Sequence, residues 1–292
     1  GHGRFCAYAV VRSADGVVRI VACVALAVAG VDAVGPYGLA IAFAPLPGVL
    51  WVALRGHLRT EDGPPAEWNE VTQNLGWLLA GSMCAAGLVN AGPLAVTVLA
   101  AEGQQASVTR FTYGVLLARV PLFMFQAVQA ALLPRLSGLA ARNEIAEFRQ
   151  GLGRLLKMVL VVAVVGTIGA YVLGPFVIEK FYDSRLDGRT LAVLALSSAT
   201  YMFALALAQA VIALRGHALV ALGWAGAAAT FVAAVAVNTG AELFARVETA
   251  LLGSSVAALV LFAVALRSRL RTGAQATGIS LVDAITDLPL EH

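Results

Sequence analysis

The stretch that decides the fold class of this chain is residues 155–178, which read LLKMVLVVAVVGTIGAYVLGPFVI. Lys157 is its single charged residue. An α-helix rises about 1.5 Å per residue, so a helix of this length is about 36 Å long and crosses the roughly 30 Å hydrocarbon layer of a bilayer. The stretch therefore predicts a transmembrane helix, and similar apolar stretches recur along the chain.

The composition agrees with a protein embedded in a membrane. Of the 292 residues, 60% are hydrophobic and 13% are charged, and the mean hydropathy is +0.83. A soluble domain has about 25% charged residues, which it needs to cover its surface. The composition therefore excludes a soluble domain and predicts an all-α polytopic membrane protein.

Eight stretches are long and apolar enough to be transmembrane helices. They are residues 17–34, 36–54, 75–100, 108–133, 155–178, 190–214, 217–237 and 247–266. Three of them are expected to be bent or interrupted: the second at Pro36, Pro45 and Pro47, the third at Gly92–Pro93 and the fourth at Pro121. Broken helices are tolerated in lipid where the freed backbone groups face protein or a water-filled cavity. These interruptions favour a transporter-like interior over a passive anchor.

The positive charges predict the orientation. With eight spans, fourteen of the 20 Lys and Arg residues fall on the side that holds both termini, four fall on the opposite side, and Arg110 and Arg119 lie within the fourth span. Loops rich in Lys and Arg remain in the cytoplasm. We therefore expect a multi-pass protein of the cytoplasmic (inner) membrane, with both termini of this chain in the cytoplasm.

One segment on this positively charged side and the C-terminal end suggest further structure. Residues 134–154 are predicted to form an amphipathic surface helix, with Phe148 and Leu152 on one side and Arg149 available to lipid phosphates. A solvated connector is the alternative. Residues 267–292 begin with three arginines and are expected to form a disordered tail.

Short motifs resemble those of one transporter family. Residues 119–123 read RVPLF, Gln126 and Gln129 follow, and residues 133–137 read LPRLS. Residues 35–40 read GPYGLA. These motifs resemble helices and a cytoplasmic loop of the polysaccharide and lipid-linked oligosaccharide flippases (Wzx type) in the MATE-like MOP exporter superfamily.

The resemblance implies a domain organisation in which the last six helices form the second lobe of a two-lobe transporter. Residues 1–54 would hold the last two helices of the N-terminal lobe, residues 55–73 a cytoplasmic linker between the lobes, residues 74–266 the C-terminal six-helix lobe, and residues 267–292 a cytoplasmic tail. The first four helices of the family would be absent. We therefore expect this sequence to be a fragment.

Arg119 is the leading candidate for a substrate-binding residue. A charged side chain at the centre of a bilayer costs about 2.5 to 3.5 kcal/mol, so it normally faces a cavity or an opposite charge. Thr112 and Gln126 stand seven residues on either side, within about 20° of the same helix face, and Gln129 lies nearby on that helix. Because Arg pairs bidentately with phosphate oxygens, the stripe predicts a site for a lipid-linked diphosphate. The alternatives are a structural ion pair with Asp32 or Glu102, or snorkelling to the interface.

Other polar residues within the spans are weaker candidates. Arg110 is a second candidate for the anionic substrate, although an anchor at the membrane interface explains it as well. Asn90 can hydrogen-bond sugar hydroxyls, as can Ser197, Ser198 and Tyr201, but such groups also hold helices together. Asp32 is a candidate for binding a coupling ion, with an interfacial position as the alternative.

The sequence favours a transporter over an enzyme. The three cysteines and four histidines are scattered without metal-ligand spacing, and no phosphate-binding loop appears, so we expect no metal, no cofactor and no catalytic residue. We expect the chain to flip a lipid-diphosphate-linked oligosaccharide, a precursor of a cell-surface polysaccharide, by alternating access. The expected partners are the bilayer, this anionic lipid and polysaccharide assembly proteins, but no nucleic acid. The alternatives are a cation-coupled drug exporter of the same superfamily and a membrane polysaccharide polymerase or glycosyltransferase.

Overall fold

The computed structural model describes residues 5–55 and 68–286, without the side chains of residues 5–9, 12, 68–71, 73–74, 126–133 and 272–286. The described residues form eleven helices and contain no strand, which confirms the predicted all-α class. The helices divide into two compact units, residues 1–66 and 67–292. The division into parts of two transporter lobes, with the bounds predicted from the sequence, remains a prediction.

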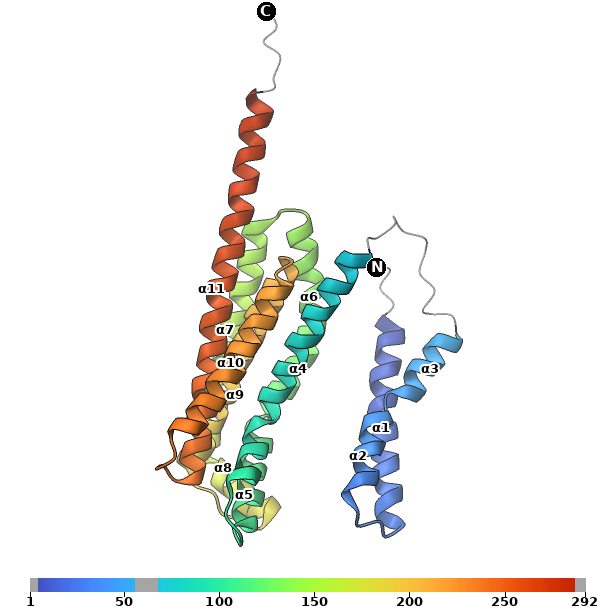
Figure 1. Cartoon of the computed structure of the whole chain (residues 1–292), viewed down its shortest axis with the longest axis vertical. Coiled ribbons are helices and arrows are strands. Elements are labelled where there is room, and N and C mark those ends of the chain that lie inside the picture. The colour runs from blue at the N-terminus through green and yellow to red at the C-terminus, as the bar shows by residue number, and fades with distance from the viewer. Residues whose placement is uncertain (1–4, 56–67, 287–292) are drawn as a thin grey trace, which may run out of the picture. The chain divides into compact units, whose positions relative to one another are not determined.

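In the first unit, the described residues 5–55 form three helices (Figure 1). They are α1 (Phe5–Val28), α2 (Val34–Phe43) and α3 (Leu46–Leu54). The predicted break in the second span is confirmed, because α2 ends before Ala44 and Pro45 and α3 begins after them. Gly48 allows α3 to approach α1 closely, since a Cβ atom here would lie 3.1 Å from the Cα atom of Val11.

Seven helical segments are long and apolar enough to cross a membrane, where the sequence predicted eight. Within the described residues they are 34–54, 75–99, 105–125, 145–172, 188–213, 217–237 and 243–271. The predicted span 17–34 is the one without a counterpart. Its helix, α1, begins earlier and includes Arg12, Asp15 and Arg19, and the Arg19 guanidinium lies 2.9 Å from the Asp15 carboxylate. Both termini can face the cytoplasm only if α1 also crosses the membrane, so their orientation remains a prediction.

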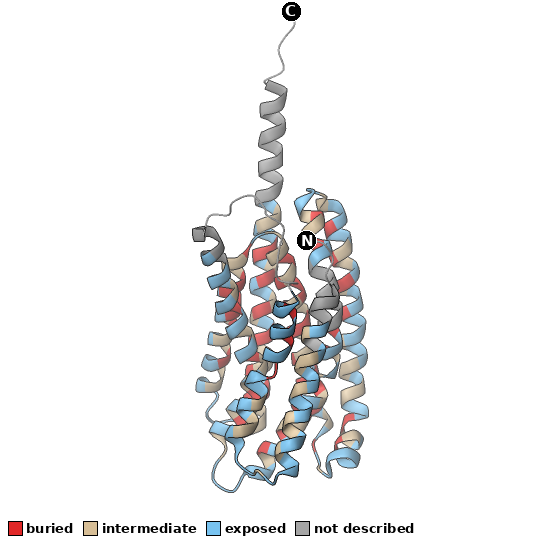
Figure 2. Cartoon of the chain, turned by 90° about the vertical axis from the view of Figure 1, so that its right-hand side faces the viewer, coloured by how far each residue is buried: buried red, intermediate tan, exposed pale blue. Residues whose placement is uncertain are grey.

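The second unit is a helical bundle built around α9 (Figure 1). Its helices are α4 (Trp68–Leu99), α5 (Gln105–Ala118), α6 (Val120–Ala141), α7 (Ile145–Val172), α8 (Gly174–Tyr182), α9 (Gly188–Ala213), α10 (His217–Val237) and α11 (Leu243–Thr286). Helix α9 packs most extensively on α11 and α7, and it also contacts α5, α6, α8 and α10. Its many alanines allow this close approach, and residues such as Ala204 and Ala210 are fully buried. Figure 2 shows buried residues along the sides on which the helices face one another.

The prolines of this unit act differently from one another. The predicted interruption at Pro121 is confirmed, because α5 ends at Ala118 and α6 begins at Val120. The interruption predicted at Gly92–Pro93 is wrong, since α4 continues through Pro93 to Leu99. Packing supports α4 here: a Cβ atom at Gly92 would lie 2.9 Å from the Leu251 side chain of α11. Tertiary contacts of this kind allow a transmembrane helix to continue past a proline.

The prediction that residues 134–154 form one amphipathic surface helix is wrong. These residues form the end of α6, a turn at residues 142–144 and the start of α7. Asn143 has a φ of 58°, a left-handed conformation that ends a helix, and a hydrogen bond from Arg142 lowers the pKa of the Glu144 carboxyl. Phe148 and Leu152 are 0% and 6% exposed, so the apolar side of this segment faces the protein core rather than lipid.

The C-terminal segment also differs from the prediction. A disordered tail was expected from residue 267, but α11 continues as a helix to Thr286. The residues that favour disorder in this segment are glycines and threonines at single positions, and each is tolerated within a helix that has already formed.

Candidate functional site

The break between α5 and α6 places Arg119 inside the bundle. Pro121 has no backbone N–H and its ring clashes with the preceding turn, which disfavours a regular helix, and the helix is interrupted here. Arg119 adopts φ −92° and ψ −7° at the junction. The chain still turns helically, because the Arg119 N–H donates to the Val115 carbonyl at 3.2 Å and the Phe123 N–H donates to the Arg119 carbonyl at 3.1 Å. Arg119 thus lies at the joint between two nearly continuous helices.

The Arg119 side chain enters a cavity that lies between four parts of the bundle. The lining comes from α4, from the α5–α6 junction, from α9 and from α11. Measured as the space open to the centres of water molecules, the cavity is about 40 Å³. One water molecule needs about 10–15 Å³ on this measure, so the cavity holds only a few waters around the guanidinium. Leucine and valine side chains make up much of the remaining wall.

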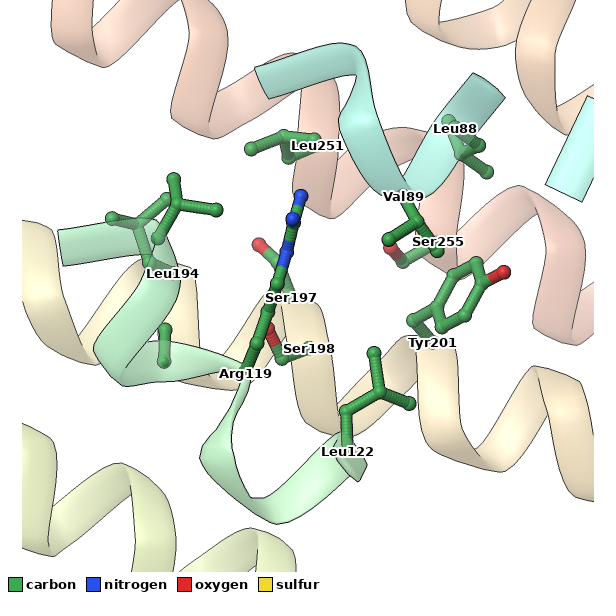
Figure 3. A pocket seen from close by; sticks show the side chains of 12 residues that line it. Leu88, Val89, Arg119, Leu122, Leu194, Ser197, Ser198, Tyr201, Leu251 and Ser255 are labelled. Carbon is green, nitrogen blue, oxygen red and sulfur yellow. The ribbon is translucent and has the colours of Figure 1, made fainter. Parts of the chain in front are cut away.

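Four hydroxyl groups share this cavity with the guanidinium. They belong to Ser197, Ser198, Tyr201 and Ser255. Figure 3 shows the Arg119 side chain extended past Ser197 and Ser198 toward Leu251, with Tyr201 across the cavity. Ser197 donates to the Val193 carbonyl at 2.8 Å, and Tyr201 donates to the Ala85 carbonyl at 3.3 Å. A cation surrounded by hydroxyl groups is suited to an anionic, oxygen-rich ligand.

Arg119 has no partner of opposite charge within the described part of the chain. The ion pairs found there join Arg19 to Asp15, Arg142 to Glu144 and Arg185 to Glu179. Glu102, which the sequence offered as a possible partner, is exposed and does not pair with Arg119. The Ser198 and Ser255 hydroxyls likewise have no hydrogen-bond partner among the described residues. The cavity therefore presents a positive charge and two hydroxyl groups that are available to a ligand.

Two other residues predicted for this site, Thr112 and Asn90, do not line the cavity. Thr112 lies about two turns before Arg119 on the same helix, α5, and its hydroxyl donates to the Val108 carbonyl at 2.9 Å. Asn90 is exposed and donates to the Ala86 carbonyl at 2.9 Å. The side chains of Gln126 and Gln129 lie outside the described residues.

Two further candidates lie elsewhere. Arg110 is exposed and lines a separate pocket of about 640 Å³ on the same measure, together with Thr109, Arg185 and two stacked tyrosines. The rings of Tyr113 and Tyr182 are 4.3 Å apart there. Asp32 is exposed in the turn between α1 and α2 of the first unit.

The sequence analysis missed one polar residue that lines the cavity and one buried acidic residue. Ser255 lines the cavity from α11, and Glu248 is 1% exposed on the same helix. A serine in an apolar span gives no signal by itself, because the side on which it lies depends on how the helix packs. Glu248 did carry a signal, since an ionisable residue within a span is rare and usually functional.

Comparison with protein families identifies one matching family. A family model described as Lipid II flippase MurJ matches residues 16–214, more than half of the chain. The chain belongs to the MurJ lipid II flippase family. The match begins within α1 and ends just after α9, so it includes the α5–α6 junction with Arg119. No curated protein and no solved structure matches the chain.

Membership of the MurJ family supports several predictions made from the sequence. It makes the chain a membrane transporter of the MOP type that flips a lipid-linked substrate, rather than a catalytic enzyme. With seven apolar helices, it also supports a multi-pass protein of the inner membrane. The match supports the superfamily expected from the motifs, but it does not identify the Wzx polysaccharide type.

Proposed function

We propose that this chain moves a lipid-diphosphate-linked saccharide across the cytoplasmic membrane, and that the substrate is the peptidoglycan precursor lipid II. The observation that carries this proposal is the Arg119 guanidinium, which lies in a cavity and has no carboxylate partner among the described residues. The diphosphate supplies the missing negative charge. The family description, which names lipid II, supports this choice of saccharide.

The positive charge of the cavity argues against the drug-exporter alternative. An exporter of cationic drugs needs acidic groups in its cavity, since like charges repel. The charged residue that lines this cavity is Arg119, and its polar neighbours are serines and a tyrosine. These residues suit phosphate and sugar oxygens and would repel a cation.

The size of the cavity implies that the bundle must open for a saccharide to enter. A space of about 40 Å³ accommodates a few waters but not a sugar ring. We therefore interpret the structure as a closed arrangement in which Arg119 is ready for the diphosphate. Alternating access would enlarge the space on one side of the membrane and then on the other.

The substrate is tested with lipids that share a carrier but differ in the head group. The protein, expressed from its complete coding sequence, is reconstituted in vesicles, and the movement of labelled lipid between leaflets is measured. We expect lipid II to move, whereas a sugar linked through a single phosphate should move at least about 10-fold more slowly, because one charged hydrogen-bonded group is lost. Movement of a polysaccharide precursor but not of lipid II would contradict the lipid II assignment and keep the diphosphate site.

The hydroxyl groups of the cavity allow a finer test. Replacing Ser255 by alanine should lower the rate of flipping about 2- to 10-fold, because one hydrogen bond to the substrate contributes about 0.5 to 1.5 kcal/mol. Ser254→Ala is a matched control, since Ser254 is fully buried next to Ser255 but donates to the Leu251 carbonyl and does not line the cavity. Equal effects of the two substitutions would exclude a role of Ser255 in binding.

A further inference from the structure

Helix α11 carries an acidic residue within its membrane-spanning segment. Glu248 is 1% exposed and lies about one and a half turns after Leu243, the first residue of the helix. Its neighbours Val247 and Ala250 are fully buried, so the carboxyl group lies within the packed core of the bundle. By contrast, Asp32, the acid that the sequence offered for ion coupling, is exposed.

The groups around Glu248 do not balance the negative charge that its ionised carboxylate would carry. The Thr190 hydroxyl of α9 interacts with the carboxyl group, and Arg189 and Asp187 near the start of α9 add charges of opposite sign. Within the described residues, no ion pair involves Glu248, and its Oε1 atom has no hydrogen-bond partner. Arg246, on the same helix, instead donates to the Val235 carbonyl of α10 at 2.7 Å.

The other helices at this end of α11 contribute mainly apolar contacts. From α5, the ring of Phe111 packs 5.1 Å from that of Phe244. Leu191 of α9 is 1% exposed beside Thr190. An ionised carboxylate in such surroundings is strongly disfavoured relative to the neutral acid. The described residues contain no group of three or more acidic, histidine or cysteine side chains, so they offer no such ligand set for a divalent metal ion at Glu248.

We propose that Glu248 is a proton-binding site, occupied while α9 and α11 are packed together and vacated when their ends near Thr190 and Glu248 separate. A proton needs only one carboxyl oxygen, and Oε1 has no other partner. Separation would admit water, which stabilises the ionised form and releases the proton. The inference does not depend on the substrate, because it concerns the proton alone.

The spacing of residues connects this site to the cavity. Ser197 follows Thr190 by seven residues on α9, and Ser255 follows Glu248 by seven residues on α11. Seven residues are two helical turns, so each pair lies on one face of its helix and about 10 Å apart. Both serines line the cavity. The same α9–α11 interface therefore carries the proton site at one level and the cavity two turns away. A movement that separates the two helices at one level would also change their packing at the other.

Infrared spectroscopy tests the protonation directly on the full chain in lipid. At neutral pH we expect the carbonyl band of a protonated carboxylic acid in the unmodified protein. The band should be lost in Glu248→Gln and kept in Glu242→Gln, which alters an exposed acid near the same end of α11. An unmodified protein without this band at neutral pH would overturn the proposal, and that measurement needs no variant to fold.

Thermal unfolding at different pH values provides a second test. A group that holds its proton only in the folded state stabilises the fold at low pH, and this contribution is lost as the pH rises. As the pH rises above about 4.3, the ordinary pKa of a glutamate in the unfolded chain, the melting temperature should fall by about 5 °C more in the unmodified protein than in Glu248→Gln. Equal slopes would contradict proton binding. Stabilisation by sodium at high pH that requires Glu248 would instead indicate a metal-cation site and overturn the proton assignment.

Discussion

Replacing Arg119 by alanine is expected to lower the rate of lipid flipping about 100-fold, because a buried charged contact to the diphosphate is worth about 2 to 5 kcal/mol. Arg119→Lys should keep part of the activity, since lysine retains the charge but cannot form the bidentate pair with phosphate oxygens. The rates are measured with labelled lipid II in vesicles that contain equal amounts of folded protein.

Arg154 is a suitable control for this experiment. It is an exposed arginine on α7, outside the cavity, and no ion pair of the described residues involves it. Arg154→Ala removes the same charge from the chain and should leave the rate within a factor of about 2, as surface substitutions usually change free energies by less than about 0.5 kcal/mol. A wild-type rate in both Arg119→Ala and Arg119→Lys would remove Arg119 from the mechanism.

A change at Gly223 is expected to have a large effect on stability. The sequence around this residue is rich in Gly and Ala, which permits close helix contact. A Cβ atom at Gly223 would overlap the ring of Phe262 on α11. Phe262 is fully buried and its ring lies edge-on to Trp224 at 4.9 Å, so it has little room to move. Gly223→Ala should therefore destabilise the bundle by about 1 to 3 kcal/mol.

Thermal unfolding in detergent or lipid measures this effect. Gly169→Ala on α7 is the control, because a Cβ atom there would have no neighbour within 4 Å. That substitution should be neutral or stabilise the helix by about 0.5 to 1 kcal/mol, since alanine loses less conformational entropy than glycine. If Gly223→Ala were as stable as the unmodified protein, the close contact between α10 and α11 would be wrong. Smaller destabilisation on a Phe262→Leu background would confirm that the ring is the obstacle.

The sequence predicted best the helix ends that depend on residues adjacent to them in the chain. Residues 217–237 were predicted as a span and form α10 with the same bounds. The break near Pro121 also followed from local chemistry, because a proline in the middle of a helix removes a hydrogen bond wherever it occurs. Pro93 shows the limit of this rule, since contacts from α11 support α4 there.

The parts of the site that could not be predicted depend on tertiary packing. Arg119 was identifiable because a charge in an apolar span is costly in any surroundings. Thr112 lies about two turns before Arg119 on α5, as the spacing predicted, but the packing of the neighbouring helices leaves it outside the cavity. Ser255 is brought to the cavity by the packing of α11 on α9, which no pattern within α11 indicates.

The position of α9 restricts how the second unit can change shape. Because α5, α6, α7, α8, α10 and α11 all touch this one helix, sliding it along its axis would disturb every one of those contacts at once. Tightly packed interfaces resist gradual deformation. We therefore expect α9 to keep its position within the bundle during the transport cycle. Movement is then expected in the helices around α9: the discontinuous pairs α5–α6 and α7–α8 can bend at Arg119 and Leu173, and α11 can move away from α9 at its end near Glu248.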